Sequence, residues 1–294
     1  MTTNLIINQL LVGIATTSIL FLVSSGLNVI FGLLGIINFA HASLYALGAY
    51  IAYTVAIYSG SFWVALIVAP VVVAIIGAGV EAILLRRIYK QEDVYQLLLT
   101  FGLILIFEDL TTVVWGTSPI TIPSLGPFLS SGLEIAGSYF PTYYLFIIVM
   151  GIVVGLGLIL FLDKTRPGKM LKAAITNKDM AATLGLNVKL TYTLVFALGA
   201  WLGGFGGVLA GGINTMQPDM GMWIIIDSFA VVVMGGLGNI YGAMLGSLII
   251  GLWKAFGLLI IPQFSMVFIY IAMVVVLIWK PEGLFGSRNL IRKA

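Results

Sequence analysis

Five ionisable side chains lie inside apolar stretches of this 294-residue sequence, and they are the first candidates for chemistry. A titratable group surrounded by apolar residues is costly, so it needs a partner or a water-lined cavity. Such groups serve as proton relays, ion sites, substrate contacts or structural ion pairs. The five are His41, Glu108, Asp109, Asp227 and Lys254.

His41 is the one histidine of the chain, and Asn38 and Ser43 stand close to it. Two interpretations are open. The three polar residues line a pathway, or His41 is a neutral histidine held by a backbone carbonyl at the start of a helix. We slightly favour the second.

The four charged residues divide into two pairs. Glu108 and Asp109 are adjacent, so their side chains point to diverging helix faces, and one carboxyl is expected to be protonated or capped. Asp227 and Lys254 fall in the outer halves of consecutive predicted spans. For these two we favour a structural ion pair over a contact with substrate.

Enzymatic chemistry is excluded in its common forms. The chain has no cysteine and a single histidine. It therefore lacks the side chains for a cysteine or histidine metal cluster, and a hydrolytic triad is excluded as an arranged site. It has no G-x-x-x-x-G-K-[ST] phosphate loop, and the glycine-rich stretch 235–242 lacks the necessary lysine and hydroxyl. We therefore expect no cofactor on this chain, no metal site and no ATP hydrolysis.

The composition is that of an integral membrane protein. Apolar residues make up 61% of the chain and charged residues 9%, against roughly half and a quarter in soluble domains. A segment in lipid must satisfy its own backbone hydrogen bonds, so the spans are predicted to be helices. The expected fold is an all-α polytopic bundle of about 8–10 spans, with broken helices in two related halves. We place spans near 5–27, 42–59, 62–85, 94–115, 142–162, 191–212, 222–236, 240–261 and 264–280.

Basic residues fall in three groups, near 86–90, 164–189 and 280–293, and the positive-inside rule places these groups in the cytoplasm. The N-terminus, which lacks a cleavable signal, is then outside and the C-terminus inside. We treat residues 1–294 as one transmembrane domain. Its parts are a first half 1–115, an external loop 116–141, a second half 142–280, a cytoplasmic loop 163–190 and a tail 281–294.

The cytoplasmic loop is the one long hydrophilic interval, and it is not featureless. Pro167 and Gly168 are expected at the centre of a type II turn. Thr176 or Asn177 can cap a short helix of about two turns, and Gly185 suits its left-handed end. That helix, Lys178–Leu184, would present Met180, Ala181 and Leu184 as an apolar knob; a plain solvated loop is the alternative.

Two glycine-interrupted apolar runs form a weak internal repeat, Gly32–Asn38 and Gly235–Ile240. Broken segments in corresponding positions of two halves indicate a binding site at the membrane midplane, whereas tight turns are the simpler alternative. Small residues also recur every fourth position, which predicts close helix packing. These ridges are Gly199, Gly203, Gly207 and Gly211, then Gly238, Gly242 and Gly246, and finally Gly48, Ala52 and Ala56.

The external loop is rich in proline and nearly uncharged. It is expected to be either a cap that packs on the bundle or a plain connector, and the connector is favoured on general grounds.

One stretch, Gly26–Tyr50 (GLNVIFGLLGIINFAHASLYALGAY), closely resembles the N-terminal motif of the branched-chain amino-acid ABC transporter permeases of the LivH type. Three further stretches match the same family, so the resemblance covers nearly the whole chain. They are Thr100–Trp115, the cytoplasmic loop through Gly211, and Gly235–Gly251.

The resemblance implies a coupling helix that docks on an ATPase. Here Met180 replaces the glutamate of the general importer pattern, and two residues rather than three separate the paired alanines from Gly185. The residues assigned to coupling are Lys178, Asp179, Met180, Ala181, Ala182, Thr183, Leu184 and Gly185.

The implied assembly contains two ATPase subunits that hold ATP and Mg, a second related permease and a periplasmic binding protein, in the bacterial inner membrane. We expect an importer subunit for branched-chain or related hydrophobic amino acids. Urea, short amides and aromatic acids are alternatives known in the family. An ion-coupled carrier acting alone and a non-transporting anchor are alternatives of other classes. The residues expected to line the pathway are Asn28, Asn38, His41, Ser43 and Asn239.

Overall fold

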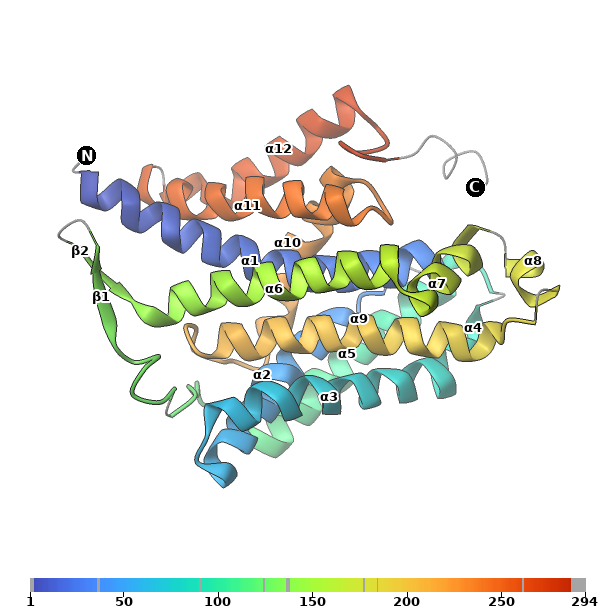
Figure 1. Ribbon diagram of the computed structural model, residues 1–294, viewed down its shortest axis with the longest axis horizontal. Coiled ribbons are helices and arrows are strands. Elements are labelled where there is room, and N and C mark those ends of the chain that lie inside the picture. The colour runs from blue at the N-terminus through green and yellow to red at the C-terminus, as the bar shows by residue number, and fades with distance from the viewer. Residues whose placement is uncertain are drawn as a thin grey trace.

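The computed structural model is an elongated helical bundle whose long helices run between two ends (Figure 1). It describes residues 3–35, 38–89, 91–123, 125–135, 138–176, 178–183, 185–260 and 262–286. The long helices are α1 (Thr3–Leu34), α2 (His41–Ser59), α3 (Phe62–Val80), α5 (Asp93–Trp115), α6 (Thr142–Lys164), α9 (Val188–Gly211), α10 (Met220–Gly235), α11 (Ile240–Ile260) and α12 (Ser265–Trp279). The short elements are a π-helical turn (Glu81–Leu85), α4 (Arg86–Ile88), β1 (Gly132–Ile135), β2 (Ser138–Pro141), α7 (Arg166–Thr176), α8 (Lys178–Thr183) and a 3₁₀ turn (Pro262–Phe264).

Each of the nine predicted spans corresponds to one of these helices. Within the described residues, seven helices are long and apolar enough to cross a membrane, and α10 and α12 are shorter apolar helices. Large apolar side chains on the outside are well exposed, among them Ile67 at 69% and Val113 at 82%. Surfaces of this kind face lipid in a membrane protein. The prediction of an all-α polytopic membrane protein is confirmed.

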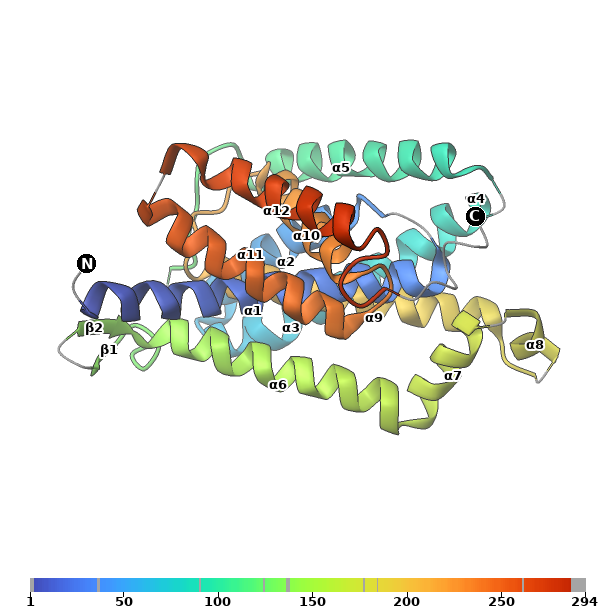
Figure 2. The same cartoon turned by 90° about the horizontal axis from the view of Figure 1, so that it is seen from above.

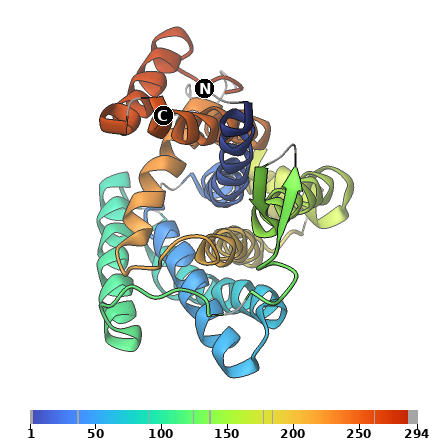
Figure 3. The same cartoon turned by 90° about the vertical axis from the view of Figure 1, so that its left-hand side faces the viewer.

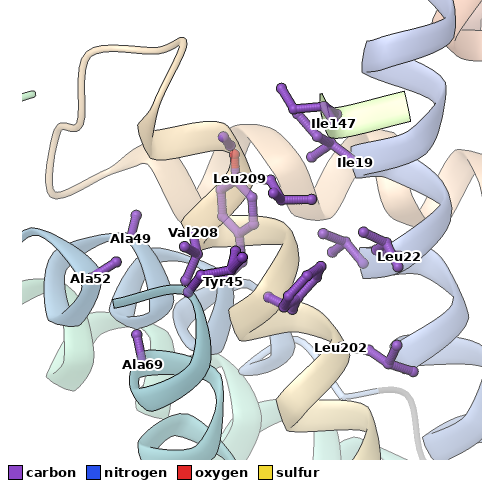
Figure 4. Packing of buried hydrophobic residues seen from close by; sticks show 14 of the residues in the cluster. Ile19, Leu22, Tyr45, Ala49, Ala52, Ala69, Ile147, Leu202, Val208 and Leu209 are labelled. Carbon is purple, nitrogen blue, oxygen red and sulfur yellow. The ribbon is translucent and has the colours of Figure 1, made fainter. Parts of the chain in front are cut away.

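Helix α9 is the centre of the bundle. It packs against α1, α2 and α3, whereas α5 lies along one edge (Figures 2 and 3). Buried apolar side chains from five helices meet around it (Figure 4). They include Ile19, Leu22, Tyr45, Ala49, Ala52, Ala69, Ile147, Leu202, Val208 and Leu209.

Glycines allow these close approaches, as the four-residue ridges predict. A Cβ on Gly207 would clash with the Tyr45 carbonyl, and one on Gly48 would clash with the backbone of Gly204. The same holds for α10 against α11, where Gly235 and Gly242 meet backbone to backbone. Backbone contact without side chains is how membrane helices pack most tightly.

The hydrophilic loop 163–190 contains two helices rather than a turn and one helix. The expected type II turn at Pro167 and Gly168 is wrong, because these residues form the first turn of α7. The Thr165 hydroxyl accepts a hydrogen bond from the Gly168 N–H at 3.1 Å and so caps the helix. Proline is tolerated in a first turn, where its missing N–H costs nothing. Gly168 is needed because a side chain there would clash with the Phe161 carbonyl at the end of α6.

The proline-rich loop 116–141 packs on the bundle as a cap. It ends in an antiparallel hairpin of β1 and β2, and Ile120 pairs with Met216 of the α9–α10 connection. Ile122 is 8% exposed and Leu129 is 1% exposed, so both belong to the core. The cap alternative is therefore the correct one. The hairpin lies at the same end as the N-terminus, and α7 and α8 lie at the opposite end (Figure 1).

The backbone contact between α9 and α2 gives a direct test of the packing. Gly207→Ala places a methyl group against the Tyr45 carbonyl. We expect this overpacking to lower the free energy of unfolding by about 1–3 kcal/mol. Thermal unfolding of the purified chain in detergent measures the effect.

Gly157→Ala on α6 is the matched control, because nothing lies within 4 Å of its added Cβ. Alanine is the better helix former by up to about 1 kcal/mol, so this variant should be neutral or slightly more stable. Equal destabilisation by both variants would contradict the packing argument.

Candidate functional site

Helix α2 begins inside the bundle rather than at its surface. The His41 Nε2 atom lies 2.9 Å from the Val23 carbonyl oxygen, in the middle of α1, and the side chain is fully buried. A carbonyl can only accept, so Nε2 carries the proton and donates. Glycines make room for the ring, since a Cβ on Gly26 would come within 2.8 Å of it and one on Gly203 within 3.0 Å. His41 is thus held by a carbonyl at a helix start, and its Nδ1 atom has no partner in the described residues.

Asn38 lies just before this helix start and is fully buried. Neither polar atom of its side chain has a hydrogen-bond partner in the part of the chain that the structure describes. A buried polar group left without a partner costs about 1–3 kcal/mol. Ser43, also buried, follows within the first turn. Three of the five expected pathway residues therefore gather at the start of α2, with unused hydrogen-bonding capacity.

The other two, Asn28 and Asn239, join the two glycine-interrupted runs to each other. The Asn28 amide donates to the Asn239 carbonyl oxygen at 3.0 Å and accepts from the Gly238 N–H at 2.9 Å. A Cβ on Gly32 would lie 3.1 Å from the Gly238 Cα, so the runs touch. Ile36 and Ile37 of the first run lie outside the described residues.

The second run is a tight turn between α10 and α11. Gly236 and Gly238 have φ values of +105° and +75°, which glycine adopts without strain. The Asn239 carboxamide oxygen accepts from the N–H groups of Tyr241 and Gly242 and caps α11. Its nitrogen donates to the Phe285 carbonyl oxygen at 2.8 Å. The polar groups of Asn239 therefore hold backbone in place.

The adjacent carboxyls of α5, Glu108 and Asp109, lie in different surroundings. Glu108 is partly buried and, with Ser43 and Thr111, lines a cavity of about 10 Å³ next to the start of α10. A space of this size holds about one water. Asp109 is exposed on the edge of the bundle. Neither carboxyl forms an ion pair within the described residues.

The expected ion pair between α10 and α11 forms. The Lys254 ammonium contacts the Asp227 carboxylate, and Asp227 is only 9% exposed. Because each charge alone is costly among apolar helices, the contact between the two residues stabilises both at this position.

At the opposite end, the short helix α8 ends as expected. Gly185 has a φ of +83°, and the N–H groups of Leu186 and Gly185 donate to the carbonyls of Ala181 and Ala182. This is the Schellman arrangement of a helix end. Met180 is 62% exposed, but Ala181 is 2% exposed and packs into the core, so its place in an exposed knob is wrong. Leu184 and Asn177 lie outside the described residues, as do the side chains of Lys178 and Asp179.

The polar network around Glu81 has more members than the sequence predicts. Glu81 is fully buried, and its carboxylate accepts from Arg86, Tyr89 and Thr193, each at 2.7 Å. Arg86 lies five residues from Glu81 in the sequence, whereas Thr193 lies 112 residues away. A π-helical turn at Glu81–Leu85, with its i→i+5 period, brings the Glu81 and Arg86 side chains together. Burial, and then the bond to Glu81, raise the pKa of Tyr89 above its ordinary value.

Residues 9–277 match the family described as "Branched-chain amino acid transport system / permease component". The chain belongs to this permease family. It is 28% identical to the permease protein BraD of Pseudomonas aeruginosa and 26% identical to LivH of Escherichia coli K12, in both cases over 95% of each chain. It is also 26% identical to LivM of E. coli K12, over 93% of this chain and 69% of LivM. No solved structure is similar enough to count as a match.

The Glu81 network connects two helices at the hydrophilic end of the permease. The Glu81 network joins the end of α3 to Thr193 in the first turns of α9, directly after α8. Three charge-assisted or hydroxyl bonds to one buried carboxylate make a rigid joint. The network therefore fastens the end of α3 to the first turns of α9.

Removing the carboxylate charge tests this joint. Glu81→Gln leaves Arg86 without its partner and Tyr89 and Thr193 with a weaker acceptor. We expect amide hydrogen exchange at 86–89 and 189–193 to become at least about tenfold faster, the equivalent of about 1.4 kcal/mol in local opening.

Glu92→Gln is the control, because the same change falls on an exposed carboxyl with no side-chain bond in the described residues. Its exchange rates should match those of the unchanged permease. Unaltered exchange in Glu81→Gln would mean that the network does not hold the two helices together.

Proposed function

We propose that this permease is the membrane subunit of an ABC importer that takes up branched-chain or related hydrophobic amino acids. The relatives supporting this carry the description "high-affinity branched-chain amino acid transport system permease protein". The proposed partners are two ATPase subunits, which bind ATP and Mg, a second related permease and a periplasmic binding protein. The similarity to both LivH and LivM favours a pair of related permeases.

The α7–α8 segment is the observation that carries the coupling role. It forms a helical, hydrophilic projection at one end of a bundle that is otherwise apolar (Figure 1). Met180 and Ala182 are exposed on α8, whereas Ala181 anchors it to the core. In this proposal the ATPase contacts the exposed face, and the Schellman end at Gly185 passes the motion to α9. This end is cytoplasmic, and the hairpin and the N-terminus face outward.

The pathway in this proposal passes the start of α2. Asn38, His41 and Ser43 present buried polar groups there, and Glu108 faces the same region from α5. Asn28 and Asn239 act on the pathway indirectly, by fixing the turn beside it. Alternating access would move tightly packed helices as units, since close backbone packing leaves little room for rearrangement between them.

An exposed-face substitution tests the coupling. Ala182→Arg adds a bulky charge to the face of α8 that meets the ATPase, without touching the core. We expect at least about a tenfold loss of ATP-dependent leucine uptake in reconstituted vesicles, with a matching loss of ATPase co-purification, because an unpaired charge at an interface costs several kcal/mol.

Thr117→Arg is the matched control, since Thr117 is exposed at the opposite end. It should retain ATPase co-purification. If the permease alone carries leucine down an ion gradient, with no response to ATP or to Ala182→Arg, an ion-coupled carrier replaces the importer.

A second test concerns the pathway. Asn38→Leu keeps the branched shape and the number of heavy atoms of the side chain but removes the two unpartnered polar atoms. We expect uptake to decrease about tenfold or more while the permease gains thermal stability, because about 1–3 kcal/mol of unsatisfied burial is relieved. Asn4→Leu, on an exposed asparagine at the start of α1, serves as control. Full uptake in Asn38→Leu would remove these atoms from the pathway.

A further inference from the structure

A cavity of about 260 Å³ lies toward the hairpin end of the permease from the start of α2, and Tyr45, one helical turn after His41, forms part of its wall. Its walls come from α1, α2, α6, α10, α11 and the α9–α10 connection. The N-terminal end of α1, the C-terminal end of α11 and that connection all face the viewer in Figure 3. Pockets for drug-sized ligands are about 300–1,000 Å³, so this space suits a smaller molecule.

Hydrogen-bond donors without acceptors line this cavity. The Lys254 ammonium has three N–H groups, and among the described residues only Asp227 accepts from it. Tyr45 and Tyr144 contribute hydroxyls, and Asn214 contributes an amide. None of these three side chains has a hydrogen bond within the described residues. A cluster of donors beside an ammonium favours a carboxylate or another small anion.

Apolar side chains form another part of the lining. Ile19 and Leu20 of α1 and Ile224 at the start of α10 face the same space. An aliphatic group would be shielded from water there. The lining thus matches a molecule with an anionic head and a branched hydrocarbon tail.

Ligand binding explains the Asp227–Lys254 ion pair better than a purely structural role does. A buried pair is seldom worth more than apolar residues of equal volume, so its retention in a span calls for a use. Lys254 is partly exposed at the cavity, whereas Asp227 does not line it. Asp227 therefore holds the ammonium in place, and the remaining N–H groups of Lys254 are available to a ligand.

The geometry points to this cavity as a binding site for aliphatic amino acids, in which Lys254 binds the carboxylate and Ile19, Leu20 and Ile224 contact the side chain. The choice of an amino acid rests on the proposed function, whereas the preference for a carboxylate rests on the lining alone. The site would receive substrate before it reaches the start of α2.

Equilibrium binding separates this site from a structural ion pair. The probe is radiolabelled L-leucine on the assembled transporter in nanodiscs, without binding protein or nucleotide. Two competitors isolate the head group: 4-methylpentanoate lacks the ammonium, and isoamylamine lacks the carboxylate. We expect 4-methylpentanoate to compete and isoamylamine not to compete.

The double variant Asp227→Asn with Lys254→Met removes both charges together, so no lone charge is left among the helices. It should bind leucine at least about tenfold more weakly, as expected for the loss of a charge-assisted contact. Tyr45→Phe, which removes one hydroxyl without changing packing, should weaken binding about two- to tenfold. Lys280→Met, remote from the cavity, should bind leucine as the unchanged permease does.

Leucine binding that is unchanged in both the double variant and Tyr45→Phe would overturn the site. Equal competition by isoamylamine, or no leucine binding at all, would also overturn it. ATP-dependent uptake by the same transporter, reconstituted in vesicles, tests the proposed function separately. A permease that binds 4-methylpentanoate through Lys254 but imports no leucine would retain the site and lose the importer.

Discussion

The contact of α9 with α1, α2 and α3 is the constraint on which the rest of the structure depends. On α9, Gly199 leaves room for the Gly26 carbonyl of α1, Gly204 for the Val73 side chain of α3 and Gly207 for the Tyr45 carbonyl of α2. In lipid there is little hydrophobic gain from bringing helices together, so close packing supplies much of the association energy. With α9 fixed at the centre, the remaining helices surround it and expose their apolar faces.

This packing also creates the buried polar region at the start of α2. The ring of His41 fits between Gly26 of α1 and Gly203 of α9, and its bond to Val23 sets where α2 begins. Because the helix starts within the bundle, Asn38 and Ser43 are buried with it. A larger residue at either glycine would push the ring out and move the whole helix start. The same small residues therefore control both packing and polarity.

Much of this fold can be predicted from the sequence, because long apolar runs and basic clusters are strong signals in membrane proteins. Nine apolar helices follow from such signals, and within the described residues seven of them are long enough to cross a membrane. The short helix at 178–183 follows instead from its capping residues and from Gly185. The first turn of α7 does not, since proline and glycine suit both a turn and a helix start. The contact that decides the matter, Gly168 against the end of α6, is tertiary. The cap over the outer end likewise depends on core contacts of Leu129 that no local pattern reveals.

The candidate site divides in the same way. The pair between Asp227 and Lys254 is predictable, because two isolated opposite charges in neighbouring spans have little alternative. Their position on a cavity is not, since the cavity is formed by six separate segments of the chain. Glu81 is harder still, as its partner Thr193 lies 112 residues away and a π-helical turn sets its direction.

Helix α9 connects these regions in a single rigid element. Its first turns carry Thr193 and the bond to Glu81, its middle carries Gly203 against His41, and its last turns carry Gly207 against Tyr45. Tyr45 in turn lines the cavity that contains Lys254. A helix transmits displacement along its axis with little internal deformation, because its hydrogen bonds run in that direction. Movement of α8 would therefore reach the start of α2 and the cavity together, and one motion could change access to both.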